Sequence, residues 1–137
     1  MFYDKNEMNA QKYRLLKQFF GHESFRSGQE ELADSILSGR DAVGIMPTGA
    51  GKSVCYQLPA LMLGGITIVI SPLISLMKDQ VNSLIQSGVG CAYINSSLTR
   101  AQYETAMSRA AQGAYKIIYA APERLDSPSF QNFAQNA

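Results

Sequence analysis

The stretch Gly44–Gln57, "GIMPTGAGKSVCYQ", places two glycines, a lysine and a serine after the short apolar run Ala42–Met46. That run is ambiguous by itself. Followed by a glycine-rich turn and Lys-Ser, it predicts a strand, a loop and the N-terminus of a helix, which together form a cradle for phosphate. Gly49 and Gly51 allow backbone angles and a close approach that a Cβ would prevent.

In such a cradle, Lys52 would neutralise phosphate charge and Ser53 would offer its hydroxyl to Mg²⁺. The pattern G-x-x-x-x-G-K-[ST] is met only in part, because Met46 stands where the first glycine belongs. The alternative is a glycine-rich turn with an exposed lysine. The predicted strand before the turn and the helix after it favour the phosphate site.

Around this stretch, helical and strand patterns alternate along the chain. Apolar residues recur at helical spacing over residues 8–20, 28–39, 73–88 and 99–113, with Thr99 as an expected N-cap. Apolar strand patterns cover residues 65–71, 91–95 and 115–121, and residues 127–137 stand out only as a polar end. Strands separated by helices predict an α/β fold with a mainly parallel sheet flanked by helices.

Composition indicates one globular domain. The chain has 137 residues, 46% of them hydrophobic and 17% charged, and its net charge of +1 gives no sign of a nucleic-acid partner without a local patch. Cys55 and Cys91 form no CxxC motif, which favours buried thiols in a reducing compartment over a disulfide or a metal site. We see no signal peptide and no apolar run long enough for a membrane span, and therefore expect a cytoplasmic protein.

Four further motifs carry a family resemblance: "FGHESFRSGQEEL" (20–32), "VISPLISLMKDQV" (69–81), "YINSSLTR" (93–100) and "YAAPERL" (119–125). With the glycine-rich stretch, their order and spacing resemble the start of a RecQ-family DNA helicase of superfamily two, from about Phe19 to Leu125. The resemblance implies a partial RecA-like P-loop NTPase domain that uses ATP and Mg²⁺. Members of this superfamily often lack the first glycine of the P-loop.

The resemblance also implies how ATP is recognised. Gln29 would hydrogen-bond the edge of adenine, and Arg26 would lie near the base or the phosphates. His22 occupies the place of a tyrosine that stacks on adenine in relatives, and a solvated loop histidine is the equally open alternative. The expected nucleotide-binding residues are His22, Arg26, Gln29, Met46, Pro47, Thr48, Gly49, Ala50, Gly51, Lys52 and Ser53, with Lys52 and Ser53 catalytic and Ser53 also a Mg²⁺ ligand.

The later motifs of the family contact the backbone of single-stranded DNA. The positions that match are Ser75, Lys78, Asn95, Ser97 and Arg124. Such contacts gain affinity from charge and stacking rather than from reading a base sequence. By their spacing, the apolar residues of the same stretch belong to the core: Leu73, Leu76 and Met77.

The acidic Asp-Glu-x-His motif with which the family hydrolyses ATP is absent from the sequence. Glu123 follows an apolar strand, but Pro122 occupies the place of the metal-binding aspartate. The arginines of a second motor domain and the zinc-binding and winged-helix regions are also absent. We therefore expect residues 1–137 to be an incomplete ATP-binding domain with a helical lead-in at 1–20. It would belong to a longer 3′-to-5′ helicase of DNA repair and recombination, nucleoid-associated if bacterial.

Two other functions remain possible from the sequence. One is a nucleotide-binding module without a motor role, although the Asn-Lys-x-Asp motif of guanine-specific switches is absent. The other is an RNA helicase of the same superfamily, whose strand-contact motif usually reads Pro-Thr-Arg-Glu-Leu where this chain has "SPLISLMKDQ". Alone, the 137 residues are expected to hydrolyse no ATP and to self-associate through unpaired strand edges.

Overall fold

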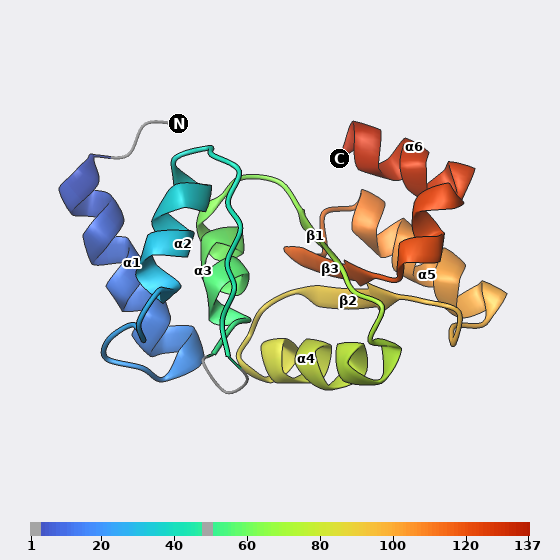
Figure 1. Cartoon of the computed structure of the whole chain (residues 1–137). Coiled ribbons are helices and arrows are strands. Elements are labelled where there is room, and N and C mark those ends of the chain that lie inside the picture. Colours follow the sequence, from blue (N-terminus) through green and yellow to red (C-terminus); the bar gives the residue numbers. More distant parts are fainter. Residues whose placement is uncertain (1–3, 48–50) are drawn as a thin grey trace. The chain divides into compact units, whose positions relative to one another are not determined.

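The computed structural model describes residues 4–47 and 51–137, which divide into two compact units, Met1–Gly64 and Gly65–Ala137 (Figure 1). The first unit contains α1 (Lys5–Phe20), α2 (Gln29–Leu37) and α3 (Val54–Met62). The second contains β1 (Thr67–Ile70), α4 (Ile74–Gln86), β2 (Cys91–Ile94), α5 (Arg100–Ala111), β3 (Ile117–Ala120), the 3₁₀ helix η1 (Pro122–Asp126) and α6 (Pro128–Asn136). No helix of the described ranges has both the length and the apolar character needed to cross a membrane.

The first unit is a helical layer held together by a small apolar cluster. Leu16 of α1 packs against Val54 and Leu58 of α3, with Phe20 and Phe25 at the border of the cluster. As predicted, α1 ends at Gly21, whose φ of 70° is the left-handed conformation that glycine adopts most easily. α2 also packs on α3, so the start of α2, which carries Gln29, and the start of α3, which follows Lys52 and Ser53, belong to the same unit.

The strand predicted at Ala42–Met46 is not formed. Residues 41–47 have no regular secondary structure, and the side chains of Val43 and Ile45 are 89% and 95% exposed. The segment runs along α2, where a Cβ on Gly44 would overlap the side chain of Leu32. A strand exists only with a hydrogen-bonded neighbour, and no described strand pairs with this segment.

The second unit is a three-stranded parallel sheet in the order β1-β3-β2. The central strand β3 is fully buried along its length, as expected for an apolar strand covered on both faces. Ala120 pairs with Ile70 of β1 and with Ile94 of β2, so the three strands end together. The expected α/β fold with a parallel sheet flanked by helices is confirmed.

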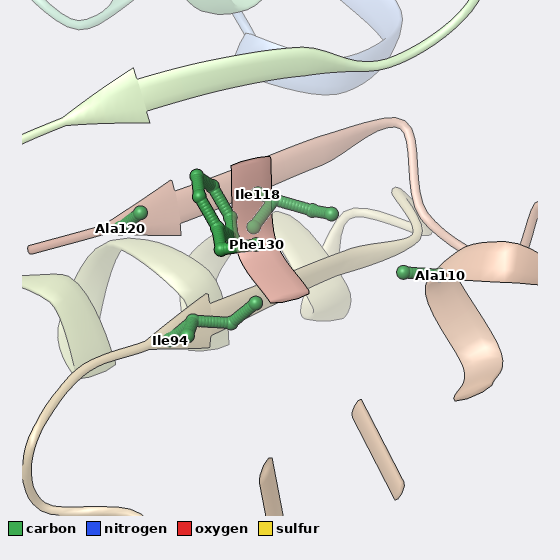
Figure 2. Close-up of a cluster of buried hydrophobic side chains, with 5 residues drawn as sticks. All are labelled: Ile94, Ala110, Ile118, Ala120 and Phe130. Atoms are coloured by element: carbon green, nitrogen blue, oxygen red, sulfur yellow. The ribbon is translucent and has the colours of Figure 1, made fainter. Parts of the chain in front are cut away.

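Helices cover both faces of this sheet. Figure 2 shows the cluster on one face, where Ile94, Ile118 and Ala120 of the strands meet Ala110 of α5 and Phe130 of α6. On the other face lies α4 (Figure 1), with Met77, Val81 and Leu84 buried at helical spacing. The core of this unit is therefore divided between two helix–sheet layers.

The sequence assigns Leu73, Leu76 and Met77 to the core, but only Met77 is buried. Met77 is 1% exposed, but Leu73 and Leu76 are 55% and 48% exposed. The buried stripe of α4 follows Met77, Val81 and Leu84, and Leu76 precedes Met77 by one residue, which turns it about 100° away from that stripe.

The polar C-terminal end forms an unexpected helix, α6. Pro128 stands at its first turn, a favoured position for proline, and Phe130 fills the core with 1% exposure. Phe133, three residues later, packs beside Phe130 with ring centroids 6.4 Å apart. Two local features of the sequence indicate this helix: the Ser-Pro start and the Phe-x-x-Phe spacing. The otherwise polar composition of the segment gave no indication of it.

Candidate functional site

Within the predicted phosphate cradle, Thr48, Gly49 and Ala50 lie outside the described residues, and the description resumes at Gly51. Gly51 has a φ of 72°, which favours glycine. Lys52 is exposed, and Ser53 is the N-cap of α3 without a side-chain capping bond. The first turn of α3 carries no acidic residue, so lysine, hydroxyl and helix N-terminus together form a suitable site for an anion.

Gln29 connects the adenine-motif loop to this cradle. It is the first residue of α2, 3% exposed, and its Nε2 donates to the carbonyl of Gly51 at 2.9 Å. Its Oε1 accepts from the backbone N–H of Arg26 at 2.7 Å. These two bonds fix which way the amide group faces. A Cβ on Gly51 would lie 2.5 Å from Nε2 of Gln29, so only glycine allows this approach.

The roles of the remaining nucleotide candidates stay predictions. The side chains of His22, Arg26 and Pro47 are exposed. The backbone N–H of His22 donates to the carbonyl of Leu16 at the end of α1. This bond does not involve the imidazole, whose stacking on adenine stays a prediction. Met46 is half-buried, with its sulfur 3.7 Å from the sulfur of Cys55.

A buried lysine that the sequence did not single out fastens α1 to α2. The Lys12 side chain is 0% exposed, and its Nζ lies 2.6 Å from Oδ1 of Asp34 and 3.0 Å from Oε1 of Glu30. The ammonium also lies 5.7 Å from the ring centre of Phe25, and the Tyr13 hydroxyl donates to Glu30 at 2.8 Å. Glu30 directly follows Gln29, so this network holds the start of α2.

The charges in this network shift one another's pKa values. The hydrogen bond from Lys12 is the main cause that holds the pKa of Glu30 below its ordinary value, against the opposing effect of burial. Burial is the largest single effect and lowers the pKa of Lys12. The hydrogen bonds to Asp34 and Glu30 together outweigh it, so the pKa of Lys12 lies above its ordinary value. The hydrogen bond to Glu30 raises the pKa of Tyr13. Lys12 and Glu30 are therefore both charged around neutral pH.

The candidate DNA-contacting residues belong to the second unit and differ in exposure. Ser75 and Lys78 of α4 and Ser97 are exposed, whereas Asn95 is 1% exposed. Oδ1 of Asn95 accepts from the backbone N–H of Ser97 at 2.8 Å and from its hydroxyl at 2.5 Å, so Asn95 shapes the loop. Arg124 is half-buried and donates from Nη2 to the carbonyl of Asn95 at 3.2 Å. The loop ends at Thr99, which is the N-cap of α5 as expected and also forms a capping box with Gln102.

Cys55 and Cys91 are free thiols. Both are buried, and burial raises the pKa of the Cys55 thiol and raises that of Cys91 to about 12. Across residues 4–47 and 51–137, no group of three or more His, Cys, Asp or Glu side chains is arranged to hold a metal ion. The burial predicted for the two thiols is confirmed.

The chain resembles known helicases in sequence and in structure. It is 51% identical over 122 residues to the ATP-dependent DNA helicase RecQ of Bacillus subtilis, covering 88% of this chain and 21% of that protein. It is 48% identical over 116 residues to the RecQ helicase of Pasteurella multocida, covering 85% of this chain and 18% of that protein. The RecQ-like DNA helicase blm-1 of Caenorhabditis elegans is 40% identical over 123 residues, with 88% of this chain and 12% of that protein covered. The chain thus spans about a fifth or less of the length of these relatives.

A crystal structure of a hypothetical ATP-dependent RNA helicase from Sulfolobus tokodaii superposes with a TM-score of 0.69, covering 92% of this chain and 38% of that one. At 22% identity, this likeness shows the fold alone. The model of the family of DEAD/DEAH box helicases matches residues 26–136, most of the chain. The chain therefore belongs to the DEAD/DEAH box helicase family.

Proposed function

We propose that this chain is the nucleotide-binding part of an ATP-dependent DNA helicase of RecQ type. One observation carries the proposal: the Gln29 amide of the adenine motif hydrogen-bonds the Gly51 carbonyl beside Lys52 and Ser53. A base-reading group and a phosphate-binding group are thereby joined in one unit. The relatives at 40–51% identity, which are named DNA helicases, support the same function.

The phosphates of ATP would lie at the N-terminus of α3. Backbone N–H groups at a helix start favour an anion, and Lys52 adds a positive charge that can follow the β- and γ-phosphates. The Ser53 hydroxyl, which makes no capping bond, would be a ligand of Mg²⁺ together with phosphate oxygens and water. When bound, Mg²⁺ neutralises phosphate charge during phosphoryl transfer.

Adenine would be selected by the orientation of the Gln29 amide. Adenine offers an amino donor beside a ring-nitrogen acceptor, and an amide pairs with both because it has an acceptor next to a donor. Guanine offers two acceptors along the same edge, so one of them faces the amide oxygen. The bonds to Arg26 and Gly51 oppose rotation of the amide. We expect the mismatch to cost about 1–3 kcal/mol.

Single-stranded DNA would be bound through the second unit, by the exposed Ser75, Lys78 and Ser97 together with Arg124. Lys78 and Arg124 supply positive charge for phosphates, and the hydroxyls supply hydrogen bonds. Asn95 would act indirectly by holding Ser97. In the longer protein these contacts would serve 3′-to-5′ movement during DNA repair, in the cytoplasm or at the nucleoid of a bacterium.

Two alternatives are less well supported. The Sulfolobus tokodaii protein is a hypothetical RNA helicase, but the likeness of this chain to it is limited to the fold. A nucleotide-binding module without motor function would leave the DNA-contact motifs without a role. A strand-separation assay of the longer parent protein with DNA and RNA duplexes distinguishes the three, because the proposal expects that protein to unwind DNA alone.

The adenine assignment is tested by replacing Gln29 with alanine. We expect the chain to prefer ATP over GTP in competition with a fluorescent ATP analogue, and Gln29→Ala to remove most of that preference. Gln102→Ala is a matched control, since it also removes a hydrogen bond between a backbone N–H and a glutamine side chain, here from Thr99 to Oε1 of Gln102 in the capping box of α5. An unchanged preference in Gln29→Ala would show that the base is read by other residues.

A further inference from the structure

Tyr103 connects three segments of the second unit, although no sequence motif singles it out. It lies on α5, and its ring centre is 4.7 Å from Cζ of Arg124 in η1. Its hydroxyl forms a hydrogen bond of 2.6 Å with Oγ of Ser129 in α6. Oγ of Ser129 is in turn 3.1 Å from that of Ser127. The half-buried side chain of Tyr103 therefore contacts Arg124 through its ring and α6 through its hydroxyl.

Arg124 is held from a second direction by the loop that follows β2. Its Nη2 donates to the carbonyl of Asn95, and the side chain of Asn95 accepts both hydrogen bonds of Ser97. Asn95 is itself fixed, because its Nδ2 lies 3.7 Å from the sulfur of the buried Met77. The guanidinium thus contacts the hydrogen-bonded loop on one side and the Tyr103 ring on another.

This arrangement leaves Arg124 suited to bind a phosphate. A guanidinium carries five N–H donors in its plane, and stacking on a ring uses its face and none of those donors. An unrestrained arginine side chain loses considerable rotational entropy when it is ordered by a ligand. A ring that already orders the guanidinium removes part of that cost, which raises affinity without a new contact.

We infer that Tyr103 is a positioning residue for single-stranded DNA: it holds the Arg124 guanidinium ready for a backbone phosphate, beside the Asn95–Ser97 loop. The inference rests on the proposed DNA contact of Arg124. It adds a residue that itself touches no DNA and acts through the arginine. It also predicts that the ring, rather than the hydroxyl, is the essential part for binding.

The test measures binding of a fluorescein-labelled oligothymidine to the 137-residue chain by anisotropy, at several salt concentrations. Tyr103→Leu is expected to weaken binding by roughly two- to fivefold, the range of an exposed cation–π contact. It should also reduce the slope of log K against log salt by about 0.7, the effect of one lost phosphate contact on a single strand. Tyr103→Phe keeps the ring and is expected to retain the wild-type slope.

Arg124→Gln should lower the slope equally, and adding Tyr103→Leu to it should change nothing more. Thermal unfolding is followed in parallel, because a merely structural role of Tyr103 would lower the melting temperature and leave the salt slope unaltered. A wild-type slope in Tyr103→Leu would overturn the inference, as would an equal effect of Tyr103→Leu in the presence and absence of Arg124.

Lys78→Ala separates this inference from the proposed function. If the wild-type chain binds the oligonucleotide and Lys78→Ala lowers the slope while Tyr103→Leu does not, only the inference about Tyr103 is wrong. If the wild-type chain does not bind it, the proposed DNA contacts fail and the inference fails with them.

Discussion

Replacing Lys12 by methionine tests the connection between α1 and α2. Methionine keeps most of the apolar length of the lysine but removes an ammonium that lies 2.6 Å from Asp34 and 3.0 Å from Glu30. The lysine side chain is 0% exposed, whereas those of Glu30 and Asp34 are 37% and 41% exposed. After the substitution both carboxylates can still be hydrated. The loss is therefore smaller than for a pair in which both partners are buried.

The magnitude follows from these exposures. Removing one partner of a fully buried pair costs about 3–5 kcal/mol, and an exposed pair is worth about 0–1 kcal/mol. We expect Lys12→Met to lie between these limits, at about 1–3 kcal/mol. Each kcal/mol lowers the melting temperature of a unit of this size by roughly 4–8 °C. Circular dichroism during heating or in urea at pH 7 measures this effect.

Lys17→Met is the matched control, since its salt bridge with Glu23 joins side chains that are 69% and 80% exposed. We expect little change in that variant. Equal stabilities of Lys12→Met and Lys17→Met would refute the reasoning, because they would show that burial of the ammonium adds nothing.

The pH dependence has a defined sign. Because the folded pKa of Glu30 is below its ordinary 4.5, its contribution is present above 4.5 and is lost as pH falls through the folded pKa. The raised pKa of Lys12 makes its contribution complete below 10.5, with loss only at still higher pH. The difference between wild type and Lys12→Met should therefore shrink below about pH 4.5. A difference that is equal at pH 7 and pH 3 would contradict the pairing.

Four further predictions concern the glycines and the isolated chain. Gly51→Ala should displace Gln29 and weaken binding of a fluorescent ATP analogue, whereas Gly21→Ala has a similar φ of 70° with nothing within 4 Å of the new Cβ and should bind normally. Gly90→Ala places a Cβ against the backbone carbonyl of Ala114 and should destabilise the second unit by about 1–3 kcal/mol in urea unfolding, and an unchanged midpoint would contradict that overlap. The isolated chain should release no phosphate from ATP above background, with or without single-stranded DNA, because the sequence has no Asp-Glu pair to hold the metal and orient water. Light scattering should show self-association through the edge strands β1 and β2, and a monodisperse monomer would argue against it.

Much of this fold is predictable from local patterns. The helical stripes, the capping box at Thr99 and the β-branched strands all depend on residues within a few positions of one another. The Ala42–Met46 segment was assigned wrongly because a strand requires a partner, and no local pattern reveals whether that partner is present. Likewise, spacing alone could not choose between the faces of α4 that contain Leu76 and Met77.

The candidate site was predictable in its residue types but not in its network. The motifs indicated Gln29 and Gly51 separately, and their hydrogen bond depends on how α2 packs on α3. Lys12 gave no signal because a lone lysine on an amphipathic helix is usually exposed. Tyr103 gave none either, since its partners Arg124 and Ser129 are more than twenty residues away along the chain.

The central claim is that these residues form the nucleotide-binding part of a RecQ-type DNA helicase. It is tested most directly by a chimera in which this chain replaces the matching 122-residue stretch of the Bacillus subtilis RecQ helicase. The chimera should hydrolyse ATP when single-stranded DNA is added and should unwind a DNA duplex but not an RNA duplex. Lys52→Ala should abolish hydrolysis, because it removes a charge worth several kcal/mol in the transition state. A folded chimera that hydrolyses ATP equally well with Lys52→Ala, or that unwinds RNA in preference to DNA, would contradict the claim.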